Sequence, residues 1–178
     1  MTHGNASNAR IAAMAVRKRV LIVYHSLTGG TRQMADAAAR GAATAPVEVM
    51  LRAAADAGAA EVLQADGYIF ATPENLAAMS GLLKDFFDRT YYAALERLNG
   101  RPYLSLICAG TDGRTAAAQI ERIATGWRLK AVAEPFIVCT RATTPEQILA
   151  PKQLSVAQLA RCEELGATLA GGLDLGIF

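Results

Sequence analysis

A short apolar run that ends in a loop of hydroxyls and glycines constrains the fold of this chain more than any other feature. The run Val20–Tyr24 leads into the loop His25–Gly30, and a segment compatible with a helix, Arg32–Ala43, follows at once. Because the apolar run is too short for a buried helix, it is typical of a parallel strand covered on both faces. The pattern therefore predicts a strand, a polar loop and a helix in direct succession.

The loop between this strand and this helix has the composition of a phosphate-binding site. Ser26, Thr28 and Thr31 would lie where free backbone N–H groups and the positive end of the helix dipole favour an anion. Gly29 and Gly30 would let the backbone approach a ligand closely and take positive φ. The loop lacks both the lysine of a Walker A motif and the three spaced glycines of a dinucleotide fingerprint. The alternative is an ordinary strand–turn–helix unit with a threonine N-cap.

A second strand and loop, which begin at Asp66, supply the features of a family pattern. They are Thr72-Pro73, then Met79-Ser80-Gly81, then a segment that carries Lys84, Phe87 and Asp88. Together with the first loop, of the form Ser-x-Thr-Gly-x-Thr, this order resembles the NAD(P)H-dependent FMN reductases and WrbA-type quinone reductases of the flavodoxin-like fold family. The resemblance runs from about Val20 to Leu173.

The resemblance implies three loops around FMN. The first would hold the phosphate with the five hydroxyl and glycine residues named above. The second would run beside the flavin, and it implies cofactor contacts from Thr72, Pro73, Glu74, Asn75, Leu76 and Met79. The third follows the apolar strand Tyr103–Cys108 and would cover the pyrimidine edge, which implies contacts from Ala109, Gly110, Thr111, Asp112 and Gly113. Asp112 is equally compatible with an ordinary turn residue.

Two positions depart from the WrbA-type pattern. Asn75-Leu76 stands where that group has an Arg-Phe pair, and Thr111-Asp112-Gly113 lacks the histidine of its third loop. Backbone groups do much of the FMN binding in the family, so the resemblance still implies FMN. Its implication of a quinone as the electron acceptor is weaker.

The remaining chain continues the alternation of strands and helices. We expect a strand at Pro46–Leu51, a short helix that includes Glu61–Gln64, helices at Met79–Leu98 and Thr115–Thr125, a strand at Ala131–Cys139, a loop at Ala142–Lys152 and a last helix from Ser155 to Gly171-Gly172. Pro135 predicts an edge or a bulge in the fifth strand. The predicted fold is α/β, a three-layer doubly wound five-stranded parallel sheet in the flavodoxin-like order 2-1-3-4-5.

Length and composition limit the other possibilities. With 178 residues the chain predicts a single flavodoxin-like domain over residues 18–178, preceded by a disordered extension over residues 1–17. No apolar window reaches the length of a membrane span, and the first residues lack a signal-peptide core. Cys108, Cys139 and Cys162 have neither metal-ligand spacing nor a disulfide pattern. We therefore expect a cytoplasmic protein without a bound metal.

The formal net charge of +2 argues against two functional classes, electron carriers and nucleic-acid binders. Electron-carrier flavodoxins are strongly acidic, and a nucleic-acid binder would show basic patches interleaved with aromatic residues. The leading hypothesis is an FMN-dependent NAD(P)H oxidoreductase that passes electrons to a quinone, a free flavin or a similar small acceptor. The alternative is a flavodoxin-like electron-transfer module without small-molecule turnover. A third possibility is a binding protein that uses the site for another phosphate-bearing ligand. No catalytic side chain is evident.

Several single residues have a structural and a functional interpretation. His25 is compatible with a position that faces the phosphate or the flavin, but we expect a packed, hydrogen-bonded residue. Trp127 is compatible with a cover over one flavin face, but we expect it in the core or at an interface. Lys84 and Asp88, four residues apart, predict a surface ion pair. The apolar residues Leu76–Met79, together with Tyr91-Tyr92, predict an exposed patch that a homodimer or higher homo-oligomer would cover.

Overall fold

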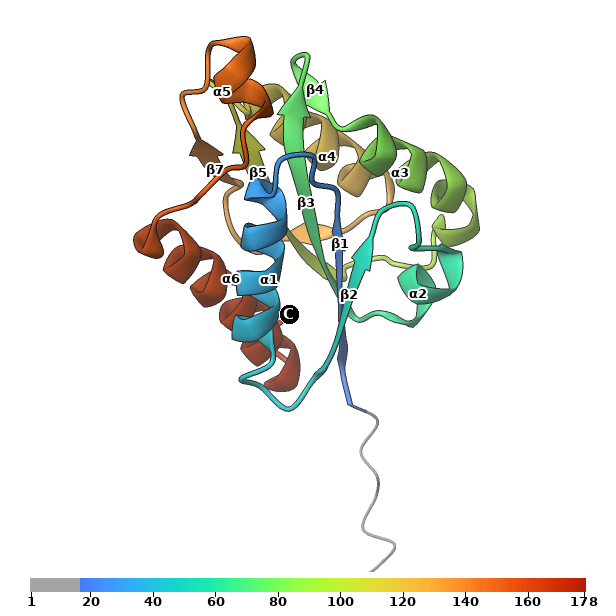
Figure 1. The fold of residues 1–178 in the computed structure, drawn as a ribbon. Helices are drawn as coiled ribbons and strands as arrows, with labels where there is room; N and C mark the ends of the chain where they lie inside the picture. The colour runs from blue at the N-terminus through green and yellow to red at the C-terminus, as the bar shows by residue number, and fades with distance from the viewer. Residues whose placement is uncertain (1–16) are drawn as a thin grey trace, which may run out of the picture.

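A parallel sheet forms the centre of the computed structural model, which describes residues 17–178 (Figure 1). Its strands follow the order β2-β1-β3-β5, and both β6 and β7 pair with β5. The strands are β1 (Arg19–Tyr24), β2 (Glu48–Ala53), β3 (Gly67–Asn75), β5 (Pro102–Ala109), β6 (Lys130–Ala131) and β7 (Phe136–Cys139). All of these pairings are parallel. The predicted doubly wound fold and strand order are therefore confirmed. The expected extension over residues 1–17 lies outside the described residues apart from Arg17.

Helices cover both faces of the sheet (Figure 1), which is why the central strands β1 and β5 are buried along nearly their whole length. One face packs against α1 (Gly30–Ala42) and α6 (Val156–Asp174). The other packs against α2 (Ala59–Gln64), α3 (Gly81–Ala94) and α4 (Arg114–Gly126). Successive residues of β1 point to opposite faces, so that Leu21 and Val23 join one core and Val20 and Ile22 join the other.

The contact between α1 and α6 depends on two glycines. A Cβ atom on Gly41 would overlap the carbonyl of Glu163, and a Cβ atom on Gly166 would overlap the carbonyl of Ala38. The two helix backbones therefore touch directly. This contact holds the middle of α6 against α1.

The predicted fifth strand is divided in two. We expected one strand over Ala131–Cys139, whereas the structure has β6 and β7 with Pro135 in the irregular segment between them. Proline has no N–H to donate to a strand partner, which accounts for the interruption. The expected loop Ala142–Lys152 contains a short helix, α5 (Pro145–Leu149), whose N-cap Thr144 accepts a hydrogen bond from the N–H of Gln147.

The helix expected from Met79 begins two residues later. Ser80 is its N-cap and accepts a hydrogen bond from the N–H of Leu83 at 3.3 Å. Met79 instead belongs to β4 (Ala78–Met79), which pairs antiparallel with the end of β3. Leu76 and Ala77 form the turn of this hairpin with φ of 50° and 57°, a left-handed conformation that is unusual for residues other than glycine.

Aromatic packing between α3 and α4 confirms the core interpretation of Trp127. Its side chain is fully buried and stacks on Tyr91 with 5.9 Å between the ring centroids. The indole N–H donates to the carbonyl of Tyr91 at 3.1 Å. Lys84 and Asp88 form the expected exposed ion pair on α3. No helix within residues 17–178 is both long and apolar enough to cross a membrane.

Candidate functional site

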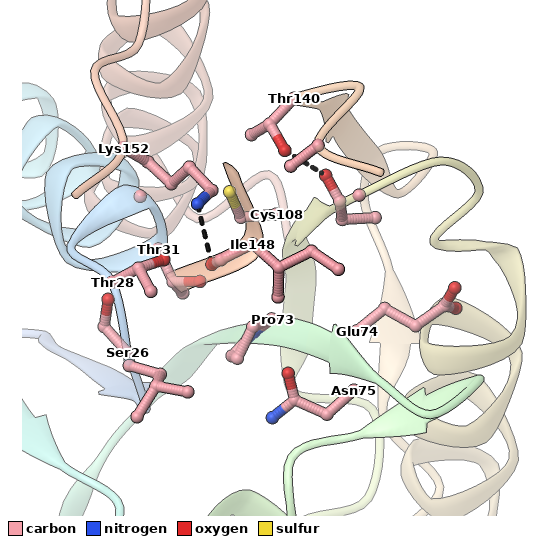
Figure 2. Close-up of a pocket in the computed structure, with 15 residues that line it drawn as sticks. Ser26, Thr28, Thr31, Pro73, Glu74, Asn75, Cys108, Thr140, Ile148 and Lys152 are labelled. Atoms are coloured by element: carbon pink, nitrogen blue, oxygen red, sulfur yellow. Dashed lines mark hydrogen bonds between the residues drawn. The ribbon is translucent and has the colours of Figure 1, made fainter. Parts of the chain in front are cut away.

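A pocket opens at the carboxyl ends of β1, β3 and β5 (Figure 2). Ligands of open parallel sheets bind at this edge, at the point where the strand order reverses. All three of the loops that we expected around the cofactor contribute to the wall of this pocket. Of the residues predicted to bind the cofactor, the structure brings together Ser26, Thr28, Gly30, Thr31, Pro73, Glu74, Asn75, Ala109 and Gly110. It leaves the other predicted residues, Gly29, Thr72, Leu76, Met79, Thr111, Asp112 and Gly113, outside the pocket lining.

The first loop is folded as an open helix N-terminus. Gly29 is the N-cap of α1 with φ of 87°, and its N–H donates to Ser26 Oγ at 3.1 Å. Within residues 17–178 the N–H groups of Gly30, Thr31 and Arg32 have no acceptor. Unpaired donors at the positive end of a helix dipole are the physical basis of anion binding at such a site.

Thr31 carries an unsatisfied polar group into this wall. Its side chain is 1% exposed, and its Oγ1 has no hydrogen-bond partner among the described residues. Buried hydroxyls are nearly always paired, and leaving one unpaired costs about 1–3 kcal/mol. Since Thr31 lines the pocket, a ligand oxygen at the N-terminus of α1 would supply the missing partner.

Gly30 is required by close approach and not by its backbone angle. A Cβ atom at this position would lie 2.5 Å from Cys108 Sγ and 3.3 Å from Lys152 Cβ. The first loop is thus held between β5 below and a segment from the C-terminal part of the chain above. Of the two glycines, only Gly29 takes the positive φ that we expected of both.

In the second loop, Thr72 has a structural role. Its side chain is buried, its Oγ1 accepts the N–H of Ser80 at 3.0 Å, and it donates to the carbonyl of Pro73 at 2.9 Å. These bonds join β3 to the start of α3 and direct the hydroxyl away from the pocket. The family resemblance implied a cofactor contact for Thr72, but the residue lies within β3 and its hydroxyl is used by these two bonds.

Glu74 lines the pocket, yet its carboxylate is used by the third loop. Oε1 accepts the N–H of Gly113 at 2.9 Å, and Oε2 accepts the N–H of Ala116 at 3.0 Å. Glu74 therefore caps the N-terminus of α4 from another element. Asn75 is exposed beside it, with its amide free of protein hydrogen bonds within the described residues. Figure 2 shows the two side chains diverging from the end of β3.

The patch expected over Leu76–Met79 is smaller than predicted. Leu76 is fully exposed at the hairpin tip, but Met79 is 5% exposed and belongs to the core. The N–H of Met79 donates to Gln119 Oε1 at 2.9 Å, which ties β4 to α4. Tyr92 is exposed, whereas Tyr91 packs on Trp127. The two residues differ because Leu76 lies in the turn at the hairpin tip, whereas Met79 lies in β4 and pairs with β3.

The third loop meets the pocket through Ala109 and Gly110 only. Asp112 accepts a hydrogen bond from Arg114 Nε at 2.6 Å, and this bond lowers the pKa of its carboxyl. Its pairing with a neighbour two residues away favours the turn interpretation over a role in binding. Gly113 is the N-cap of α4 and has φ of 88°. A Cβ atom at this position would overlap the side chain of Ile137, so the position requires glycine.

His25 was expected to be hydrogen-bonded, and for its Nδ1 atom this expectation is wrong. Nδ1 is buried without a partner in residues 17–178. Burial lowers the pKa of the imidazole. His25 does not line the pocket, although its backbone N–H donates to the carbonyl of Ala71 and so joins β1 to β3.

Part of the pocket wall was not predicted from the sequence, namely Leu27, Cys108, Thr140, Ala142, Ile148 and Lys152. Most of these residues follow β7, in a stretch that we expected to be a loop and that contains no recognisable motif. The one signal is Lys152, a cation eight residues after Thr144, the N-cap of α5. Cys108 was assigned to the core, and burial indeed raises the pKa of its thiol to about 11.

Comparisons with known proteins agree with this architecture. A family model, NADPH-dependent FMN reductase, matches residues 18–142. An NAD(P)H dehydrogenase (quinone) of Acidithiobacillus ferrooxidans is 34% identical over 40% of this chain and 46% of its own length. A flavodoxin of Aquifex aeolicus is 38% identical over 39% of this chain and 38% of its own length. The matched part of this chain thus spans about half or less of these curated relatives.

Among solved structures, an archaeal flavodoxin superposes with a TM-score of 0.73. The superposition covers 87% of this chain and 98% of that one at 19% sequence identity, which shows a shared fold. The family model covers the three loops that build the pocket wall from β1, β3 and β5, and it matches most of the sequence. The chain belongs to the NADPH-dependent FMN reductase family.

Proposed function

We propose that this protein binds FMN in the pocket at the carboxyl ends of β1, β3 and β5 and acts as an NAD(P)H-dependent oxidoreductase. The observation that carries the proposal is the buried, unpartnered Oγ1 of Thr31 beside the free N–H groups of α1. A phosphate monoester has the acceptor oxygens that these donors lack. The residues present therefore fit the phosphate end of FMN.

The first loop would hold this phosphate without a carboxylate to repel it. Thr28 and Thr31 would donate their hydroxyls, and Gly30 would let the loop lie close to Cys108. Pro73, together with its neighbours at the end of β3, would flank one side of the flavin, and Ala109-Gly110 would flank the other. When bound, FMN supplies hydride and electron transfer, and the protein contributes binding, orientation and exclusion of water.

The net charge of the chain favours enzymatic turnover over simple electron transfer to a redox partner. With a formal net charge of +2, this chain lacks the strong acidic field that steers an electron carrier to its redox partner. The relative from Acidithiobacillus ferrooxidans is named an NAD(P)H dehydrogenase (quinone), whereas the relative from Aquifex aeolicus is named a flavodoxin. The second candidate function, an electron-transfer module, rests on that latter similarity.

Anaerobic reduction distinguishes the two candidates. Purified protein loaded with FMN is mixed with NADH or NADPH, and bleaching of the flavin absorbance is followed by stopped flow. Rapid reduction by either nucleotide, followed by reoxidation with a quinone or free flavin, supports the oxidoreductase. Reduction no faster than that of free FMN, with normal electron exchange with a redox protein, supports the electron-transfer module.

FMN is expected to bind in preference to FAD. The pocket has one helix N-terminus with free donors, and its wall offers no second glycine-rich loop for an adenosine half. Reconstitution with each flavin, monitored by fluorescence quenching, measures the preference. Equal or tighter binding of FAD would contradict the assignment of the phosphate site.

We also propose a homodimer or larger homo-oligomer in which the hairpin tip lies near a subunit boundary. Leu76 is fully exposed in a left-handed turn, and Tyr92 is exposed further along α3. Light scattering at micromolar concentration, with and without FMN, tests this proposal. A monomer of 18.8 kDa in both states would reject it.

A further inference from the structure

The segment between β7 and α6 crosses the mouth of the phosphate loop, and it carries a positive charge. We call residues 142–154, which include α5, the C-terminal strap. Three of its residues, Ala142, Ile148 and Lys152, line the pocket. The family model ends at residue 142, so almost all of the C-terminal strap lies outside the match.

Hydrogen bonds to the main chain of the C-terminal strap hold it against the phosphate loop and α1. The N–H of Lys152 donates to the carbonyl of Thr28 at 2.8 Å. The side chain of Gln33, on the first turns of α1, donates to the carbonyl of Lys152 at 2.7 Å and accepts the N–H of Leu154 at 3.2 Å. Lys152 is therefore held over the N-terminus of α1 independently of its own ammonium group.

The ammonium group of Lys152 is itself held in place, but by neutral atoms. Nζ donates to the carbonyls of Gln147, Ile148 and Ala150 at 2.6, 2.9 and 2.7 Å. No carboxylate within residues 17–178 forms an ion pair with it. Figure 2 shows Nζ between the C-terminal strap and the first loop, on the same side of the pocket as Thr28 and Thr31. The three N–H groups of Nζ are thus used by main-chain carbonyls of the C-terminal strap, and the positive charge stays at the pocket wall without a counter-ion among the described residues.

Lys152 is the one cationic side chain among the described residues that line this pocket. The carboxylate of Glu74, the acidic group of the wall, is occupied by the N–H groups of Gly113 and Ala116. The buried Oγ1 of Thr31 is an independent sign that an anion-bearing ligand belongs at this end. A fixed cation beside unpaired donors is the arrangement that selects a doubly charged phosphate over a neutral alcohol.

We propose that Lys152 is a phosphate-binding residue that neutralises the dianion of FMN and sets the preference of this protein for FMN over riboflavin. The proposal rests on the proposed function, because it takes the ligand of the pocket to be FMN. The charge of Lys152 acts on the phosphate either through space or after Nζ exchanges one of its carbonyl partners for a phosphate oxygen. In both cases the binding free energy depends on the charge of residue 152 and of the ligand.

The test compares FMN with riboflavin, which lacks only the phosphate. Dissociation constants of both are measured by flavin fluorescence quenching for the wild type, Lys152→Met and Lys152→Gln. Lys152→Met removes charge and donors, whereas Lys152→Gln keeps an amide that can donate to the carbonyls of α5. We expect both variants to bind FMN about tenfold more weakly and to bind riboflavin within about twofold of the wild type.

Lys130→Met is the matched control. Lys130 is an exposed lysine on β6, paired in register with Pro102 at the amino end of β5 and so at the opposite edge of the sheet. It changes the net charge equally and should leave both affinities unchanged. Raising the ionic strength should weaken FMN binding in the wild type and in Lys130→Met more than in the two Lys152 variants.

The outcomes separate the two proposals. If the wild type binds FMN and riboflavin equally, the phosphate site itself is wrong and the proposed function fails. If the wild type prefers FMN but both Lys152 variants keep that preference, the role of Lys152 is overturned and the phosphate site stands. An equal loss of FMN and riboflavin, with an unchanged melting temperature, would show that Lys152 shapes the pocket and carries no phosphate charge, which also overturns the proposal.

Discussion

The carboxylate of Glu74 at the end of β3 accepts the backbone N–H of Gly113 at the start of α4, at 2.9 Å. This bond joins two of the loops that meet at the pocket, although the residues are 39 positions apart in the sequence. It also occupies the acidic side chain that would otherwise face an anionic ligand. The second and third loops are therefore positioned relative to each other before any ligand binds.

Replacing Glu74 by alanine should lower the free energy of unfolding by about 1–3 kcal/mol, because two N–H groups of α4 lose their acceptor. Asn75→Ala, at the exposed neighbouring position, should change it by less than about 0.5 kcal/mol. Urea unfolding of the two variants and the wild type measures the difference. Equal stabilities for the two variants would show that Glu74 does not cap α4.

Thr31→Val should have opposite effects on the protein and on the ligand. Valine has nearly the same shape, and it removes the buried hydroxyl that lacks a partner, so the apoprotein should be equally stable or about 1 kcal/mol more stable. FMN affinity should nevertheless fall about tenfold, since a donor to the phosphate is lost. Thermal melting of the apoprotein and fluorescence titration check the two halves. A destabilised apoprotein would mean that Thr31 has a protein partner.

Gly166→Ala should destabilise the fold by at least about 2 kcal/mol, because the added methyl group would overlap the Ala38 carbonyl of α1. Gly171→Ala lies on the same helix with no atom within 4 Å of the added Cβ, and there alanine should stabilise by up to about 1 kcal/mol. Denaturant unfolding of this pair isolates the contact between α1 and α6. Similar effects at the two positions would argue against direct backbone contact.

The three thiols should differ in reactivity at pH 8. Cys139 is exposed, whereas burial raises the pKa of Cys108 to about 11 and that of Cys162 to about 12. Because the thiolate is the reactive form, a raised pKa keeps the two buried thiols protonated and unreactive. A thiol-specific chromogenic reagent should therefore label one group in the native protein and all three in denaturant. Rapid labelling of Cys108 in the native state would contradict the packing of β5 under Gly30.

The parts of the site that depend on local sequence were predictable. The apolar run of β1, its hydroxyl-glycine loop and α1 follow one another directly. The spacing of their apolar residues and their composition are therefore enough to predict them. Ser155 and Gln158 likewise predicted the start of α6, where the structure has Ser155 as the N-cap. The parallel order of the sheet followed from the alternation of strands and helices.

The parts that depend on distant contacts were not predictable. Lys152 reaches the pocket because Gln33 and Thr28 hold its backbone, and nothing in the residues around Lys152 indicates those partners. The family resemblance implied a cofactor contact for Thr72, but its hydroxyl instead accepts the N–H of Ser80. The division between binding and structural roles is decided by hydrogen bonds between elements far apart in the chain.

The measurement that tests the central claim most directly is the affinity of the wild-type protein for FMN and for riboflavin under identical conditions. Both ligands carry the same ring system, so that their difference reports the phosphate alone. The free N–H groups of α1, the unpartnered hydroxyl of Thr31 and the charge of Lys152 predict that FMN binds about 100-fold more tightly, since several charge-assisted hydrogen bonds are added. Equal affinities, or no binding of either flavin, would contradict the assignment of this pocket.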